Sequence, residues 1–378
     1  MAAETVLPTS LADLIAPIGE DELRRHIRAR RPLYLPASDP DRFAGLFGWK
    51  QLEDGIARGL FQGEDLRLFI GGNEVSKAAM GAQDKAGRIK PQAVQSLVRQ
   101  GADIVVNNAQ ICHTPLWDLA CDCQKRLGDK VSIGAIASSG LGPTLPIHYD
   151  VEDLLAVQIA GTKHWTFYGE AIEGSGRQRP MPSRPTEITG TLTMRPGDVL
   201  FVPSGLHHQC RPEGMSLHLG LLIERRTGLD FIKYLSGVVA QDPAFADPIP
   251  VGQGADAVAA YEERLKRHLM GIIANTSLGD MLDRQDRQHN GAASIDLLGR
   301  RDLHAPGTII TLIGLRQSAP LPDGAEPAFV AALSELRRGG RVEAATLLSH
   351  LSEAFGPTMA HDALLSLLDR GLACLTRV

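Results

Sequence analysis

Residues 146–150 read Pro146-Ile147-His148-Tyr149-Asp150, and they lie within a series of short strand-like segments that begins near residue 130. On a β-strand, residues two apart point to the same face. His148 and Asp150 can therefore direct an imidazole and a carboxylate at one point. Such a pair supplies two of the three ligands of a 2-His-1-carboxylate metal site, which leaves other coordination positions open.

The segments on both sides of this motif predict a β-rich domain. Many short strands separated by glycine and proline turns are typical of a β-sandwich or barrel. A loop is predicted at 174–180. The predicted strands cover residues 131–139, 146–150, 154–161, 163–169, 189–194, 199–204, 207–212 and 216–223.

Helices with three short strands between them are predicted before the barrel. Ser10 and Thr114 are candidate caps for two of these helices, Pro115 suits a first helical position, and Gly128 can end a helix. The predicted helices cover 10–16, 19–31, 41–60, 91–100 and 114–128, and the strands cover 33–35, 65–70 and 104–106.

The pattern changes after residue 226. Apolar residues at helical spacing predict a helix over 255–273, and residues 274–300 are polar and mixed. A strand at 308–313 is followed by three predicted helices and a final strand, an order that resembles a small winged-helix domain. These helices cover 327–336, 342–355 and 359–371, and the strand covers 372–375.

A third metal ligand is predicted in the segment 194–208. Two turns, at 196–198 and 203–205, precede His207 and His208. In a double-stranded β-helix, a return strand of this kind places its histidine opposite the HxD motif. Adjacent strand residues point to opposite faces, so one of the two histidines can face inward, and spacing alone does not say which.

Lys163 is a candidate binding residue for an anion. It follows His148 by fifteen residues, on the strand expected after a Gly161-Thr162 turn. A dicarboxylate with one end on a metal needs a cation at its other end, and a buried lysine can provide a charge-assisted hydrogen bond there. Without the other motifs, Lys163 is better interpreted as a surface lysine at a hairpin than as a ligand-binding residue.

These motifs together resemble the JmjC/cupin-type hydroxylases, especially the ribosomal oxygenases. The similarity rests on residues 145–150, 158–165 and 197–208, with an entry strand at 31–36, and it covers about residues 20–225. It implies an α+β fold: N-terminal helices and a double-stranded β-helix barrel, followed by a helical region and a winged-helix-like C-terminal domain. The implied domains are 1–225, 226–300 and 301–378. The family's PxGxxH pattern selects His208, and its cosubstrate cation stands where Lys163 stands.

The resemblance also implies an activity. It predicts an Fe(II)- and 2-oxoglutarate-dependent oxygenase with iron on His148, Asp150 and His208, which hydroxylates a protein or peptide side chain and releases succinate and CO2. Hydroxylation is favoured over demethylation because the matching motifs are those of hydroxylases. The helical region implies a homodimer.

Further polar residues are candidates for the cosubstrate site. Ser216 and His218 lie on the last predicted strand, where such enzymes use a polar side chain near the cosubstrate. His218 either points inward to the cosubstrate or is a satisfied barrel histidine. Thr144 and Tyr34 could assist in binding.

Two other functions compete with this one. A metal-dependent cupin that does not use 2-oxoglutarate would need the metal ligands but not Lys163. A non-catalytic scaffold would bind a partner through the C-terminal helices and would need neither.

Composition limits the class of protein and its partners. The 378 residues are 43% hydrophobic and 22% charged, which predicts a packed globular chain. The net charge of −5 and the balanced charges of the last domain disfavour a nucleic-acid partner. Five irregularly spaced cysteines predict a reducing compartment rather than a disulfide framework. With no signal sequence and no apolar run of ~20 residues, we expect a cytoplasmic protein without a membrane span.

Overall fold

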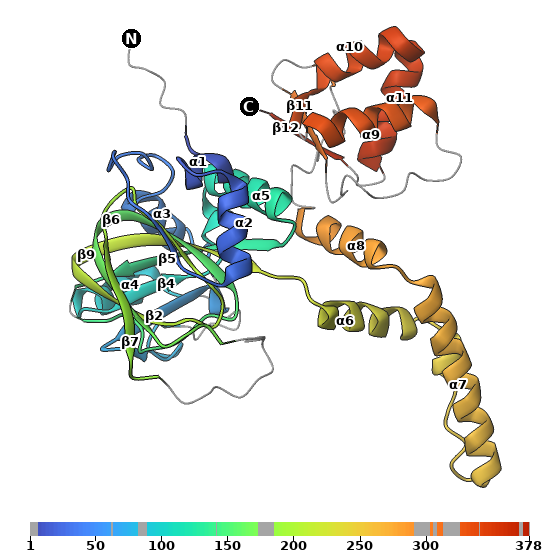
Figure 1. Ribbon diagram of the computed structural model, residues 1–378, viewed down its shortest axis with the longest axis horizontal. Helices are drawn as coiled ribbons and strands as arrows, with labels where there is room; N and C mark the ends of the chain where they lie inside the picture. Colours follow the sequence, from blue (N-terminus) through green and yellow to red (C-terminus); the bar gives the residue numbers. More distant parts are fainter. Residues whose placement is uncertain are drawn as a thin grey trace. The chain divides into compact units, whose positions relative to one another are not determined.

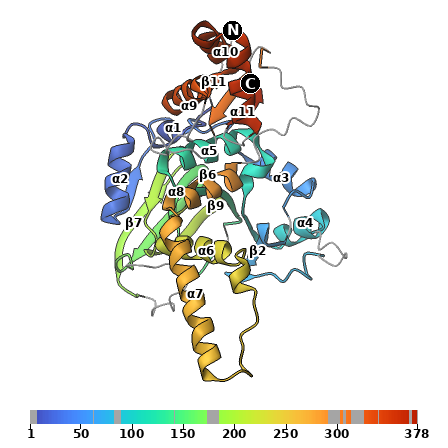
Figure 2. The same cartoon turned by 90° about the vertical axis from the view of Figure 1, so that its right-hand side faces the viewer.

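A computed structural model of the chain describes residues 7–61, 63–81, 89–140, 142–172, 185–290, 303–304, 308–312, 326–339, 341–369 and 373–377. The predicted loop at 174–180 lies outside these residues. The chain divides into two compact units, Met1–Arg226 and Thr227–Val378. Each unit is described by itself below (Figures 1 and 2).

The first unit begins with two short helices, α1 (Leu11–Ile15) and α2 (Glu20–Ala29). The predicted cap is present, because the hydroxyl of Ser10 accepts a hydrogen bond from the Asp13 amide at 3.1 Å. Both helices lie beside α5 (Thr114–Leu127), as Figure 1 shows. Gly128 ends α5 in a left-handed conformation as predicted, whereas its N-cap is His113 and not the predicted Thr114.

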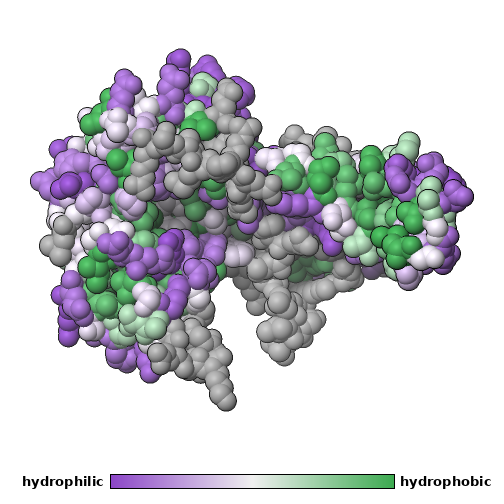
Figure 3. Space-filling view, turned by 90° about the horizontal axis from the view of Figure 1, so that it is seen from below, coloured by the Kyte–Doolittle hydropathy of each residue, from purple (hydrophilic) through white to green (hydrophobic). Residues whose placement is uncertain are grey.

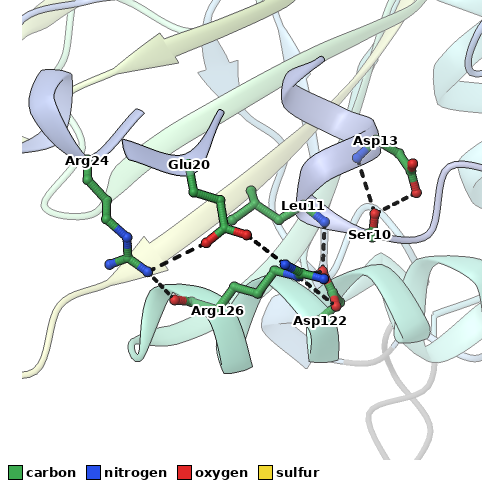
Figure 4. Close-up of polar contacts among 7 residues, drawn as sticks. All are labelled: Ser10, Leu11, Asp13, Glu20, Arg24, Asp122 and Arg126. Carbon is green, nitrogen blue, oxygen red and sulfur yellow. Dashed lines mark hydrogen bonds and ion pairs between the residues drawn. The ribbon is translucent and has the colours of Figure 1, made fainter. Parts of the chain in front are cut away.

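A network of charged side chains joins these helices (Figure 4). The guanidinium of Arg126 on α5 lies 2.7 Å from the Glu20 carboxylate and 2.8 Å from that of Asp122. Asp122 also accepts a hydrogen bond from the Leu11 amide at 2.8 Å. This contact attaches the start of α1 to α5.

The helix predicted over 41–60 is shorter than expected. It is α3 (Trp49–Ala57), and residues 41–47 form turns instead. Gly45 has a φ of +88°, outside the helical region, and Gly48 is an extended N-cap. Phe43 and Leu46 are nevertheless buried, so hydrophobicity here reflects packing rather than helical structure.

The remaining local elements of this unit precede the barrel. They are the helix α4 (Pro91–Arg99), and the single turns η1 (Gly63–Asp65) and η2 (Ala109–Cys112).

A nine-stranded antiparallel sheet forms the barrel. Its strand order is β1-β8-β6-β9-β5-β4-β2-β3, with β7 paired to β6. The strands are β1 (Leu33–Leu35), β2 (Leu66–Ile70), β3 (Asn73–Glu74), β4 (Asp103–Val106), β5 (Lys130–Ser138), β6 (Asp153–Tyr168), β7 (Ile188–Met194), β8 (Val199–Val202) and β9 (His207–Glu224).

Strands β6 and β9 are each continuous where the sequence predicts two strands. The expected turn at Gly161-Thr162 is a pair of register shifts within β6, between residues 158 and 160 and between 160 and 162. Gly161 takes up the bend with a φ of +67°. Lys163 is therefore in the middle of a strand and not at a hairpin.

These register shifts reverse the side-chain alternation along β6. Before them, Leu154 and Ala156 face the barrel interior, while Leu155 and Val157 pack in the core that contains the helices. After them, Trp165 faces the interior, so the inward-facing residues have odd numbers where those before the shifts have even numbers. The interior cluster contains Leu154, Ala156, Trp165, Phe167, Met194, Leu200, Val202 and Leu206.

The second unit contains a helical part and a small α/β part. In the α/β part, three helices pack with a sheet of order β11-β10-β12 around a leucine- and alanine-rich core. The last helices and strand differ from the predicted bounds by a few residues. The elements are α6 (Gly228–Val239), η3 (Pro243–Phe245), α7 (Ala255–Asn275), α8 (Leu278–Asn290), β10 (Thr308–Leu312), α9 (Pro327–Gly339), β11 (Arg341–Glu343), α10 (Ala344–Phe355), α11 (Pro357–Asp369) and β12 (Ala373–Arg377). Within the described parts of the chain, no helix is both long enough and apolar enough to cross a membrane.

Candidate active site

His148, Asp150 and His208 come together at one point of the barrel. Their potential ligand atoms all lie within 4.8 Å of one another. Nε2 of His148 is 3.8 Å from one carboxylate oxygen of Asp150, and Nε2 of His208 is 3.7 Å from the other. Among the described residues, they form the one cluster of this kind.

The HxD segment is not the strand that the sequence predicts. Residues 146–150 make a single isolated bridge, in which His148 pairs with His208 of β9. The short segment still carries both ligands to one point, because the bridge fixes its backbone directly opposite the third ligand.

Backbone carbonyls orient both imidazole rings. Nδ1 of His148 lies 2.8 Å from the carbonyl of Pro146, and Nδ1 of His208 lies 3.0 Å from that of Leu206. Since a carbonyl only accepts, Nδ1 must carry the proton and donate it in each ring. Both Nε2 lone pairs are then directed to the cluster, as metal ligation requires.

The structure distinguishes His207 from His208, which sequence spacing alone could not do. His208 belongs to the cluster, while His207 packs edge-on against the Tyr149 ring with centroids 5.0 Å apart. Burial is the main cause that lowers the pKa of His208. The neutral imidazole that results is the form that binds a metal.

Lys163 is buried inside the same barrel with 1% of its surface exposed. Nζ lies 2.6 Å from Nδ1 of His218, which is its hydrogen-bond partner among the described residues. Burial lowers the pKa of Lys163 to about 8. A buried ammonium that forms no ion pair with a carboxylate in the described part of the chain is suited to bind an anionic ligand.

Hydroxyl groups lie on the same inward face of β5 and β9. The Ser138 and Thr144 hydroxyls are 2.7 Å apart. Ser216 is opposite Ser138 in register, and its buried hydroxyl has no hydrogen-bond partner among the described residues. An unpaired buried hydroxyl is costly, and a polar ligand would satisfy it. Ser138 thus lies beside two candidate residues, Thr144 and Ser216, yet no sequence motif singles it out.

Two aromatic residues, Trp165 and Tyr34, differ in their relation to this site. The Trp165 ring lies 5.4 Å from the ring of His208 and 5.9 Å from that of His218, between the metal cluster and the lysine pair. Tyr34 is used elsewhere, because its hydroxyl donates to Asp198 at 2.8 Å. Burial and this carboxylate raise the pKa of Tyr34 to about 12.

The donor set fits a divalent iron site. Two neutral imidazoles and one carboxylate on one face of a metal leave adjacent positions open for oxygen and a chelating ligand. A 2-oxo acid that also carries a distal carboxylate would have Lys163 as its counter-ion. The residues present therefore fit both Fe(II) and 2-oxoglutarate.

Comparisons with known proteins identify this part of the chain. Residues 109–230 match the model of the JmjC domain family. Ribosomal oxygenase 1 of Gallus gallus is 26% identical over 238 residues, 59% of this chain and 38% of that protein. Ribosomal oxygenase 2 of Rattus norvegicus is 28% identical over 222 residues, 54% of this chain and 45% of that protein. The chain thus matches less than half the length of these curated relatives.

Solved structures share the fold. A structure of the ribosomal oxygenase YcfD from Escherichia coli matches with a TM-score of 0.56 and 17% identity, over 94% of this chain and 97% of that one. Another, described as a complex with cobalt and 2-oxoglutarate, matches with a TM-score of 0.54 and 17% identity over the same shares. At this identity, the similarity establishes the JmjC/cupin fold alone.

Proposed function

We propose that the protein is an Fe(II)- and 2-oxoglutarate-dependent oxygenase that hydroxylates a protein or peptide side chain. The observation that carries this proposal is a His-Asp-His donor set in the same barrel interior as a buried lysine that has no carboxylate partner among the described residues. The metal ligands alone would also suit a cupin that does not use 2-oxoglutarate. Lys163 favours the dicarboxylate cosubstrate.

The side chains of this site have separate tasks in the proposed reaction. His148, Asp150 and His208 hold the metal, and the Pro146 and Leu206 carbonyls keep the two rings oriented. When bound, Fe(II) and 2-oxoglutarate supply the oxidising chemistry that places one oxygen atom of O2 on a C–H bond and releases succinate and CO2.

The cosubstrate would extend from the metal toward β5 and β9. The Lys163 ammonium would bind its distal carboxylate. We propose that His218, which contacts Lys163, and Thr144, which lies beside Ser138, support that end. Trp165 and Phe167 line the interior with apolar surface and exclude water from it.

We propose a ribosomal protein as the substrate class, on the basis of the names of the relatives. Because the chain matches less than half of those proteins, their activity is carried over only as a proposal. A protein substrate is consistent with a cytoplasmic location and with no nucleic-acid partner, as the sequence predicts.

The second unit is proposed to act in assembly. We assign residues 226–300 to a homodimerisation region and residues 301–378 to a winged-helix-like domain. Helix α7 has no buried residue, and its apolar side chains Leu269, Met270 and Ile273 are 37%, 70% and 49% exposed. Ile273 follows Leu269 by four residues and Met270 by three, so its side chain lies beside both of theirs on the helix surface. Figure 3 shows apolar side chains at the right of the view, the side on which Figure 1 labels α7. A second copy of this chain is the proposed partner of that face.

The activity can be tested without knowledge of the substrate. The protein is incubated anaerobically with Fe(II), then with O2, 2-oxoglutarate and a cell extract. We expect succinate, and peptides that are heavier by one oxygen atom and absent from a His148→Ala control. Peptides that lose methyl groups would contradict hydroxylation, and failure to bind Fe(II) would favour a scaffold.

A further inference from the structure

The contact between Lys163 and His218 limits which protonation states the pair can adopt. Their nitrogens are 2.6 Å apart, and both side chains are at least 95% buried, with 1% and 5% of their surfaces exposed. Two positively charged groups cannot share that distance in a dry interior. The ammonium therefore donates to an unprotonated Nδ1 of His218, or Lys163 is itself neutral.

His218 is the partner that stays neutral. Burial is the main cause that lowers its pKa well below the usual value, and the charges of Lys163 and His208 lower it further. Its Nδ1 then remains an acceptor at and above neutral pH. The proton of the pair belongs to Lys163.

Other titratable groups that face Lys163 do not replace a carboxylate partner. Burial raises the pKa of Cys210 on β9 to about 12, so its thiol stays protonated. The carboxylate of Asp103 on β4 attracts the ammonium, but it accepts a hydrogen bond from the Ser139 amide at 2.6 Å. Without an anionic ligand, the charged form of Lys163 has only the imidazole as hydrogen-bond partner among the described residues.

We infer that the Lys163–His218 pair makes cosubstrate binding a proton-coupled event. The distal carboxylate of 2-oxoglutarate binds the ammonium form of Lys163, and His218 is a positioning residue that accepts a hydrogen bond from this ammonium. This inference rests on the proposed function. The one covalent change is the N–H bond that neutral Lys163 forms with a proton taken up from the solvent.

The direction of the pH effect follows from the free protein. Burial lowers the pKa of Lys163 to about 8, and a bound carboxylate raises it again. Well below pH 8 the lysine is already charged, so binding takes up no proton. Above pH 8 each binding event takes up close to one proton. The dissociation constant for 2-oxoglutarate then rises about tenfold from pH 7 to pH 9.

Calorimetry measures this coupling without turnover. Anaerobic Fe(II)-loaded protein is titrated with 2-oxoglutarate at pH 7 and pH 9, in buffers with different ionisation enthalpies. We expect almost no proton uptake at pH 7 and close to one proton at pH 9. 2-Oxobutyrate, which lacks the distal carboxylate, controls for protons that move at the metal, and it should show no such uptake.

Two substitutions test the part of His218. His218→Asn keeps an acceptor near the position of Nδ1, and His218→Leu removes it. We expect His218→Asn to take up protons over the same pH range as the wild type. The second should lower the pKa of Lys163, so that proton uptake begins at a lower pH.

Each outcome separates the inference from the proposed function. If 2-oxoglutarate does not bind at either pH, the proposed function fails. If it binds at both pH values without proton uptake, or if 2-oxobutyrate gives the same uptake, the coupling is wrong and the function stands. An unchanged uptake profile in His218→Leu would remove His218 from the mechanism.

Discussion

The backbones of His148 and His208 form two hydrogen bonds with each other. The His208 amide donates to the His148 carbonyl at 2.8 Å, the His148 amide donates to the His208 carbonyl at 3.2 Å, and the ring centroids are 4.5 Å apart. This isolated bridge is the means by which an otherwise irregular segment presents its two metal ligands to β9. The two imidazoles are thus fixed relative to each other before a metal binds.

Removing the His208 imidazole should weaken Fe(II) binding strongly, whereas replacing the neighbouring His207 should not. His208→Ala deletes a direct ligand, so we expect a loss of Fe(II) affinity of roughly 100-fold or more, above the range typical of outer-shell residues. His207→Phe is the matched control, because it keeps an aromatic ring beside Tyr149. Its affinity should stay within about threefold of the wild type. Anaerobic equilibrium dialysis measures both, and a comparable loss in the two variants would refute the assignment of His208.

The bulge at Gly161 should be intolerant of a side chain. A Cβ there would lie 2.2 Å from the Met215 carbonyl oxygen and 2.9 Å from Ser216. Gly161→Ala therefore adds overlap to the cost of a positive φ, about 3 kcal/mol or more in total. Gly214 has a similar φ of +72° but open space, so Gly214→Ala should cost only ~1 kcal/mol.

Urea unfolding measures this difference in the first unit alone. The three tryptophans of the chain are Trp49, Trp117 and Trp165, and all of them lie in that unit, so their fluorescence reports its unfolding. Equal destabilisation by the two substitutions would mean that the bulge yields without strain.

The bulge at Gly161 also explains why the sequence does not predict the direction of Lys163. The HxD motif is a local pattern, and the structure does place His148 beside Asp150, although the segment is not a strand. The inward direction of Lys163 depends on register shifts between β6 and β9, which no local pattern contains. Periodicity places Lys163 on the same face as Leu155 and Val157, which pack away from the barrel interior.

Packing across the chain explains the other differences. Residues 41–47 are apolar enough for a helix, but Gly45 and Gly48 allow a turn that still buries Phe43. The family pattern chose His208 over His207, and the geometry of the cluster agrees with that choice. Ser138 has no motif at all, because only the pairing of β5 with β9 brings it opposite Ser216.

Charge on the apolar face of α7 should prevent self-association. The double substitution Met270→Glu and Ile273→Glu places two carboxylates on the proposed contact, where burial of an unpaired charge is strongly unfavourable. We expect light scattering to give the mass of two chains for the wild type and of one chain for the variant. Asn275→Asp, which adds a charge on the opposite side of the same helix, should leave the dimer intact. A monomeric wild type would contradict the homodimer.

The charged network between α1, α2 and α5 should contribute less to stability than the apolar core beneath it. The Arg126 side chain is 42% exposed and its partner Glu20 is 29% exposed, so solvent screens their attraction. Arg126→Met should therefore cost about 1 kcal/mol or less. Leu14 is fully buried, and Leu14→Ala should cost ~2–5 kcal/mol. Urea unfolding followed by tryptophan fluorescence would contradict this order if Arg126→Met were the more damaging change.

The buried ammonium of Lys163 should make stability depend on pH. The folded pKa of about 8 is below the usual lysine pKa of 10.5, so between these values the unfolded chain holds a proton that the folded chain has released. Stability contributed by this group therefore rises with pH through that window, because the unfolded state binds more protons. Below pH 8 the full desolvation penalty of the ammonium remains.

Lys163→Met removes this dependence and serves as the reference. Comparing the wild type with the variant cancels the titration of all other groups. From pH 7 to pH 10, the wild type should gain about 2–3 kcal/mol of unfolding free energy relative to Lys163→Met. Urea unfolding of both proteins at the two pH values provides the measurement. A difference that does not change with pH would show that Lys163 titrates normally, and that its burial does not suppress the charged form.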